Sequence, residues 1–206
     1  MFILGLTGSL GSGKTTVAGL LKDKGARVLD SDQLARDAVE PETPGYELVV
    51  ARFGPGVLLG SGVLDRRALA QRVFGDPQAL ADLEAIIHPQ VRQLQRSTLE
   101  TWAAETPQAV VVMMIPLLFE TGAERRCDEV AVVVCGEHWR QRIGQRPMSL
   151  EAMEKARERQ MDELEKARRA NWVIENTGTL DATRTQIDRL WGALTHRPGR
   201  AWPDAW

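Results

Sequence analysis

Residues Gly8 to Thr15, which read GSLGSGKT, have the spacing G-x-x-x-x-G-K-[ST] between a strand-like run, Phe2 to Leu6, and helix-forming residues from Thr16 to Lys22. In this pattern the glycines let successive backbone N–H groups turn toward phosphate oxygens, and the lysine reaches the β and γ phosphates. Because a strand enters and a helix leaves, a phosphate-binding loop is favoured over a ligand-free turn. The residues expected to bind phosphate are Gly8, Gly11, Ser12, Gly13, Lys14, Thr15 and Thr16, and the Thr15 hydroxyl can also ligate Mg²⁺.

A second reactive group follows the next apolar run, where the chain reads Asp30-Ser31-Asp32. A carboxylate at the tip of a neighbouring strand could accept a proton from a hydroxyl that attacks the γ-phosphate, and Asp32 is the candidate base. The alternative is structural, because Asp32 or Ser31 could cap a helix that begins near Gln33. The local sequence leaves both interpretations open.

Composition limits the class of protein. The chain has 206 residues, 43% of them hydrophobic, and a formal net charge of -2, which suits one large core and gives no overall positive field for nucleic acid or membrane. No run reaches the roughly 18 apolar residues of a spanning helix, and no signal-peptide pattern is present. Cys127 and Cys135 lack metal-site spacing, so free thiols are expected. These features favour a soluble cytoplasmic enzyme.

Five apolar runs rich in β-branched residues alternate with helix-forming stretches. This order predicts an α/β fold with a five-stranded, mostly parallel sheet in a three-layer α/β/α arrangement. The runs are Phe2 to Leu6, Arg27 to Leu29, Ala109 to Ile115, Glu129 to Val134 and Trp172 to Ile174. Ligands of such sheets bind beyond the carboxyl ends of the strands. The segments expected along that edge are the phosphate-binding loop, Asp30 to Asp32, Pro116 to Glu120 and Gly136 to Trp139.

The segment between the second and third runs, about 41–106, is far longer than a crossover needs and predicts a helical substrate-binding insertion. Its helix-forming stretches are Tyr46 to Phe53, Asp65 to Val73 and Pro77 to Glu105. A helix junction is expected at His88-Pro89, because proline favours the first position of a helix. The core would then comprise about 1–40 and 107–196. A tail, 197–206, is expected to fray, with docking of its two tryptophans on the body as the alternative.

A polar helical segment at about 140–170 spaces acidic and basic residues four apart, as in Asp162 and Lys166. This pattern fits either a mobile helical lid or a solvated helical hairpin. Arg142 and Arg146 lie four apart on one helical face, where a closing lid could bring both guanidinium groups to phosphates. Ordinary surface arginines are the alternative.

Further motifs follow the loop in a fixed order. They are Leu29-Asp30-Ser31-Asp32-Gln33-Leu34-Ala35-Arg36, Val39-Glu40-Pro41, Asp65-Arg66-Arg67-Ala68-Leu69, Ile87-His88-Pro89, Ile115-Pro116-Leu117-Leu118-Phe119-Glu120 and Val173-Ile174-Glu175-Asn176. Together with the loop, this set resembles the dephospho-coenzyme A kinase family from Phe2 to about Leu194. The loop alone marks a superfamily, whereas the ordered set is specific. The resemblance implies ATP- and Mg²⁺-dependent phosphorylation of the ribose 3'-hydroxyl of dephospho-coenzyme A, the last step of coenzyme A synthesis.

The resemblance also implies roles for single residues. By analogy Asp32 accepts the proton of the 3'-hydroxyl, while Lys14, Arg142 and Mg²⁺ neutralise charge on the transferred phosphoryl group. Arg146 would contact the phosphates. Asn176 would border the adenine, although a turn is an alternative for Asn-x-Gly.

The acceptor is expected to contact residues from two parts of the chain, namely Asp32, Arg66, His88, Pro116, Leu117 and Glu120. Structural alternatives stay open for several of them. His88 could belong to a helix cap, Leu117 could simply pack in the core, and Arg67 beside Arg66 could lie on a solvated helix end.

Two departures from the family pattern bear on the mechanism. Pro147 follows the lid arginines at a position where Asp or Asn is typical. The third apolar run, Ala109 to Ile115, does not end in an acidic residue. Without a Walker B aspartate, Mg²⁺ would rely on Thr15, the phosphates, water and Asp32. Another small-molecule P-loop kinase remains the nearest rival. A GTP-dependent switch is disfavoured, because the chain has no Asn-Lys-x-Asp motif.

Overall fold

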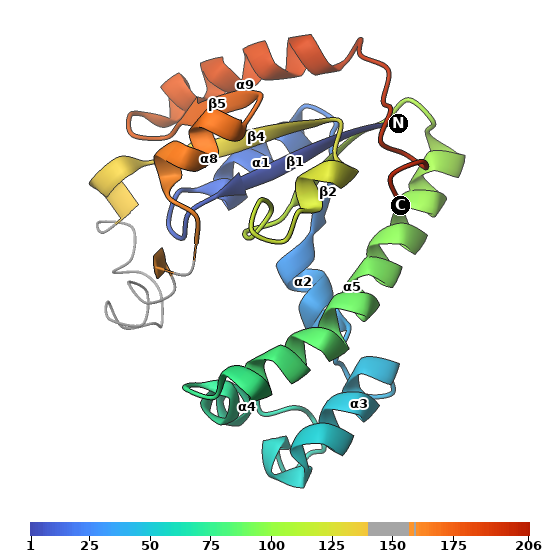
Figure 1. The fold of residues 1–206 in the computed structure, drawn as a ribbon. Helices are drawn as coiled ribbons and strands as arrows, with labels where there is room; N and C mark the ends of the chain where they lie inside the picture. Colours follow the sequence, from blue (N-terminus) through green and yellow to red (C-terminus); the bar gives the residue numbers. More distant parts are fainter. Residues whose placement is uncertain (140–156, 159) are drawn as a thin grey trace. The chain divides into compact units, whose positions relative to one another are not determined.

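The computed structural model of this chain describes residues 1–139, 157, 158 and 160–206 (Figure 1). These residues form two compact units, one of residues 1–30 and 102–206 and one of residues 31–101. None of the described helices combines the length and the apolar character that crossing a membrane requires.

The first unit is built on a parallel sheet. Among the described residues its strands, in spatial order, are β2 (Arg27–Asp30), β3 (Val110–Met114), β1 (Phe2–Gly8), β4 (Glu129–Val134) and β5 (Trp172–Glu175). Every neighbouring pair runs parallel, and Leu6 of β1 lies opposite Met114 on one side and Ala131 on the other. The predicted α/β fold is confirmed, and each predicted apolar run forms a strand. The phosphate-binding loop therefore follows the central strand, β1, which has β3 on one side and β4 on the other.

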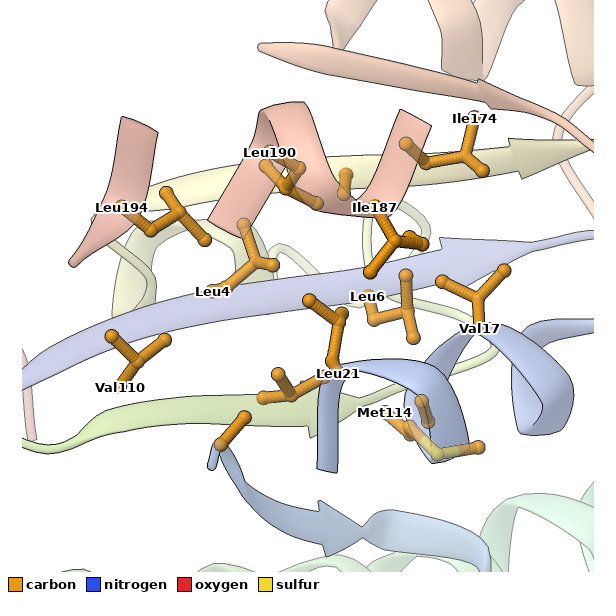
Figure 2. Close-up of a cluster of buried hydrophobic side chains, with 14 of the residues drawn as sticks. Leu4, Leu6, Val17, Leu21, Val110, Met114, Ile174, Ile187, Leu190 and Leu194 are labelled. Atoms are coloured by element: carbon orange, nitrogen blue, oxygen red, sulfur yellow. The ribbon is translucent and has the colours of Figure 1, made fainter. Parts of the chain in front are cut away.

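One face of the sheet is covered by α1 (Lys14–Asp23) and α9 (Leu180–Leu194). Figure 2 shows side chains of both helices converging on Leu4 and Leu6 of β1. Leu4, Leu6 and Leu21 are completely buried, and each such side chain contributes about 2 kcal/mol of hydrophobic free energy. This packing holds β1 and α1, the two elements that flank the loop, against one core.

The opposite face is approached closely by the segment that follows β3. A side-chain carbon at Gly5 would lie 2.8 Å from the Cys127 sulfur, so any larger residue would have to displace that side chain. Burial raises the pKa of the Cys127 thiol to about 12, which keeps it protonated and unreactive at neutral pH. Both cysteines are free, as predicted. A further helix, α8 (Glu163–Arg169), packs beside β4.

The second unit is helical. Its helices are α2 (Ser31–Asp37), α3 (Pro44–Phe53), α4 (Arg66–Val73) and most of α5 (Pro77–Glu105), with a 3-10 turn at Pro55–Val57. Side-chain caps begin three of them, because Thr43 accepts the Tyr46 N–H, Asp65 accepts two N–H groups of α4 and Asp76 accepts two N–H groups of α5. The core of this unit consists of Val39, Val49, Phe53, Val57, Leu64, Leu69 and Ala79.

The predicted helix junction at His88-Pro89 is wrong. Pro89 does not begin a helix but lies inside α5, which buries Ala79 before it and Val91 after it. Packing on both sides therefore outweighs the hydrogen bond that an internal proline removes. The helix predicted near Gln33 begins at Ser31, so Ser31 and Asp32 lie within its first turn.

The C-terminal tail does not fray but docks on the first unit, which was the alternative. The Asp128 carboxylate accepts the backbone N–H groups of Arg200 and Ala201, and its other oxygen accepts the Ile3 N–H at 2.7 Å. The Trp202 and Trp206 rings lie 5.9 Å apart. One carboxylate thus joins the start of β1 to the C-terminal tail.

Replacing this carboxylate should release the tail. Asp128→Ala removes a charged acceptor from N–H groups of both segments, and we expect the free energy of unfolding to fall by about 2–4 kcal/mol. Amide hydrogen exchange in residues 197–206 should accelerate. The control is Asp204→Ala, an exposed carboxylate of the same tail. Unchanged exchange in the tail of Asp128→Ala would contradict this account.

Candidate functional site

The phosphate-binding loop joins β1 to α1, and glycines stand where its backbone leaves β1 and where it enters α1. Gly8, the last residue of β1, has φ +152°, and a side-chain carbon there would lie 2.5 Å from the Val133 carbonyl oxygen of β4. Gly13 immediately precedes α1 with φ +94°, in the left-handed region. The close passage of β1 past β4 and the turn into α1 together determine the shape of the loop.

The N-terminal end of α1 is suited to an anion. The first N–H groups of a helix have no partner within it and carry the positive end of its dipole, and no acidic residue lies in the first turn of α1. Thr15 and Thr16 are exposed in that turn. The Lys14 ammonium folds back over the loop and donates to the carbonyls of Gly8 at 2.7 Å and Ser9 at 3.1 Å. A cation, a helix terminus and two hydroxyls therefore meet at one short loop.

Asn176 supports the loop from the junction of β5 and α9. Its side chain is buried, donates to the Ser12 carbonyl at 2.8 Å and accepts the Thr183 hydroxyl at 3.1 Å. The contact with adenine remains a prediction. The contacts made in the structure give Asn176 a role in holding the backbone of the loop.

A charged network lies at the same edge of the sheet, just beyond β3. The Pro116 carbonyl accepts both the Thr7 hydroxyl, at 3.2 Å, and the Lys166 ammonium, at 3.2 Å. The Lys166 side chain is fully buried and lies 2.9 Å from the Glu120 carboxylate. Burial alone would raise the pKa of Glu120, but hydrogen bonds from Lys166 and from the Met161 N–H outweigh it, and this pKa lies below its ordinary value of 4.5.

Sequence spacing did not identify this ion pair. Asp162 and Lys166 are four residues apart, but Asp162 caps α8 by accepting the Leu164 and Glu165 N–H groups. Lys166 instead reaches Glu120, which is far away in sequence. The four-residue spacing of Asp162 and Lys166 therefore did not reveal the partner of Lys166, because burial of the ammonium demands a partner inside the unit.

The remaining predicted residues are distributed over both units. In the first unit, Leu117 is 37% exposed beside Pro116, at the edge that carries the loop. In the second unit, Asp32 and His88 are exposed on α2 and α5. Arg66, at the start of α4, pairs with Glu40 at 2.8 Å. Within each unit these side chains are accessible to a ligand.

Only part of the predicted lid, about 140–170, lies within the described residues. Arg142, Arg146 and Pro147 lie outside the described residues. Arg157 and Gln160, which the sequence analysis did not single out, both contact the backbone of the loop at Leu10. No local signal marked them, since they are polar residues in a polar helical segment.

The metal prediction depends on the chemistry of the donors. The hydroxyl of Thr15 is a hard oxygen ligand, and Mg²⁺ commonly uses few protein ligands because it retains water and phosphate oxygens. Among the described residues there is no cluster of three or more His, Cys, Asp or Glu side chains that could hold a metal by itself. The donor set fits a Mg²⁺ ion that arrives with phosphates.

A five-stranded parallel sheet whose central strand ends in this loop defines a nucleotide-binding protein of the P-loop class.

Comparison with known proteins defines the family. Residues 2–182 match the family model described as dephospho-CoA kinase. The dephospho-CoA kinase of Moorella thermoacetica is 43% identical over 94% of this chain and 92% of its own length. The solved structure of TT1252 from Thermus thermophilus is 40% identical, covers 94% of this chain and 97% of its own, and has a TM-score of 0.80. That of the dephospho-CoA kinase from Campylobacter jejuni is 26% identical with a TM-score of 0.70, covering 94% and 96%. This chain belongs to the dephospho-CoA kinase family, whose members are ATP-using kinases. The family that the sequence motifs indicated is therefore confirmed.

The Lys166–Glu120 pair makes a testable contribution to stability. Lys166→Met leaves the Glu120 carboxylate, which is only partly buried, without its cation, and we expect a loss of about 1–2 kcal/mol in the free energy of unfolding near pH 7. In the unaltered protein the lowered pKa of Glu120 stabilises the fold above the ordinary value of 4.5 and ceases to do so as the pH falls through the folded-state pKa. The difference between the two proteins should therefore shrink toward acidic pH.

Urea denaturation near neutral pH and near pH 4 measures this difference. Arg168→Met, on the exposed side of the same helix, is the matched control. The account is contradicted by an equal loss of stability at both pH values.

Proposed function

We propose that this protein transfers the γ-phosphoryl group of ATP to the ribose 3'-hydroxyl of dephospho-coenzyme A, giving coenzyme A and ADP in the cytoplasm. The observation that carries the proposal is a glycine-built phosphate loop on the central strand of a chain that belongs to this family. Dephospho-coenzyme A would be its small-molecule partner.

The donor half of the mechanism rests on the loop residues. Backbone N–H groups from Gly8, Gly11, Ser12, Gly13, Lys14, Thr15 and Thr16 would surround the phosphates. The Lys14 ammonium, which donates to two loop carbonyls, would exchange them for phosphate oxygens and offset the charge that develops during transfer. Thr15 would hold Mg²⁺, which supplies positive charge at the phosphates. Asn176 would keep the loop in shape and border the adenine.

The acceptor half rests on Asp32. β2 ends at Asp30, and parallel strands present their carboxyl ends at one edge, so a residue two positions later is a reasonable candidate for the base. The Asp32 carboxylate would take the proton of the 3'-hydroxyl, whose oxygen forms the new bond to phosphorus as the bond to ADP breaks. Contacts that orient the acceptor are assigned to Arg66, His88, Pro116, Leu117 and Glu120. Arg142 and Arg146 would neutralise the phosphates from the lid.

Acceptor profiling tests the proposed reaction. With ATP and Mg²⁺, dephospho-coenzyme A should be converted to coenzyme A, and omission of the acceptor should reduce ATP consumption to a small background. AMP, UMP and CMP serve as control acceptors for a nucleoside monophosphate kinase. Rapid turnover of these nucleotides without 3'-phosphorylation of dephospho-coenzyme A would refute the proposal, and so would acceptor-independent hydrolysis.

The role of Asp32 is tested separately. Asp32→Asn should lower kcat by about 10²- to 10⁴-fold, since it removes general base help. ATP affinity should be retained, because the donor loop is unaltered. Asp37→Asn on the same helix is the control. Steady-state kinetics and calorimetric ATP titration give both quantities, and near-normal turnover of Asp32→Asn would rule out its role as base.

A further inference from the structure

Two side chains hold the same residue of the phosphate loop from both of its backbone groups. The Leu10 N–H donates to the Gln160 side-chain oxygen at 2.9 Å, and the Leu10 carbonyl accepts from the Arg157 guanidinium at 2.8 Å. The two side chains belong to one short turn, because the Gln160 N–H donates to the Arg157 carbonyl at 2.9 Å. Both are only partly exposed. Leu10 is thus gripped by a segment about 150 residues away in sequence.

Trp139 adds an apolar contact to this grip. Its ring lies 4.5 Å from the Arg157 guanidinium, and it packs with Leu10 and Cys135 in a small buried cluster. It also passes so close to the loop that a side-chain carbon at Gly11 would lie 3.1 Å from its Cβ. We call Trp139, Arg157 and Gln160 the Leu10 clamp.

The clamp has a fixed base. The Glu163 carboxylate, at the start of α8, accepts the backbone N–H groups of Cys135 at 3.0 Å and Gly136 at 2.9 Å. These residues follow β4, the strand beside β1. The segment that carries Arg157 and Gln160 is therefore joined to the end of β4, and all of these contacts lie within the first unit.

We propose that Arg157 and Gln160 are positioning residues that shape the phosphate loop for nucleotide binding. The loop contains three glycines with positive φ, and a free chain of this composition loses much conformational entropy when it closes around a phosphate. Ties at Leu10 from the clamp and at Ser12 from Asn176 restrain the loop before the ligand arrives. The identity of the nucleotide as ATP rests on the proposed function.

This role differs from direct contact with the reacting groups. Gln160 is uncharged and bonds the loop backbone, so its loss should weaken ATP and ADP binding alike. Turnover at saturating ATP should change little, because Lys14 and Asp32 are untouched. A purely structural role would instead lower thermal stability without a selective effect on nucleotide affinity.

The test uses Gln160→Met, Arg157→Met and Arg157→Lys in the full chain. Calorimetric titration without the acceptor should show the Kd of both ATP and ADP rising by about 5- to 20-fold in the two methionine variants, with a smaller rise in Arg157→Lys, which keeps a donor. The kcat and the KM for dephospho-coenzyme A should stay within about twofold. Amide exchange at Leu10 should accelerate in Gln160→Met.

Controls and contrary outcomes are defined by the same measurements. Gln93→Met on α5 and Arg168→Met on α8 replace exposed residues of matching type and should leave nucleotide affinity unchanged. The inference is overturned if both methionine variants bind ATP and ADP normally, if kcat falls while affinity is retained, or if the controls lose as much affinity. It stands if nucleotide binding depends on the clamp but dephospho-coenzyme A is not phosphorylated, an outcome that removes only the proposed function. Failure of the unaltered protein to bind either nucleotide overturns both.

Discussion

The contact that most constrains this protein is the close approach of Gly8, the last residue of β1, to the Val133 carbonyl of β4. No side chain fits at that point, so glycine is needed where the chain leaves β1 for the loop. A further glycine, Gly13, takes a left-handed φ where the loop enters α1. The position of the phosphate site relative to the sheet follows from this geometry. The buried leucines of β1, α1 and α9 supply the rigidity that keeps both ends of the loop in place.

Near this contact, polar side chains hydrogen-bond the backbone of the phosphate loop, which the hydrophobic core does not reach. Asn176 binds the carbonyl of Ser12, and Arg157 and Gln160 bind the peptide groups of Leu10. Each tie is worth little by itself, but a loop that is already ordered loses less entropy when it binds an anion. Less of the interaction free energy between the loop and phosphate is then offset by the cost of ordering the loop.

The two halves of the proposed reaction differ in how their residues are held. The donor loop and the nearby Lys166–Glu120 pair are embedded in hydrogen bonds within the first unit. Asp32 and His88 of the second unit are exposed side chains on helices. A restrained donor loop suits the highly charged triphosphate, whereas exposed side chains suit an acceptor that must enter and leave with each turnover.

Local patterns in the sequence were enough to predict the five strands, the motif of the loop and most helices, since periodicity and glycine spacing act over a few neighbouring residues. The ordered motifs likewise indicated the family. Tertiary structure alone decided that Lys166 pairs with Glu120, that Pro89 stays inside a helix and that Asp128 holds the tail. It also decided that Arg157 and Gln160 reach Leu10. These partners are distant in the chain, and a buried or restrained polar group is satisfied by whichever partner folding brings near it, which no local pattern encodes.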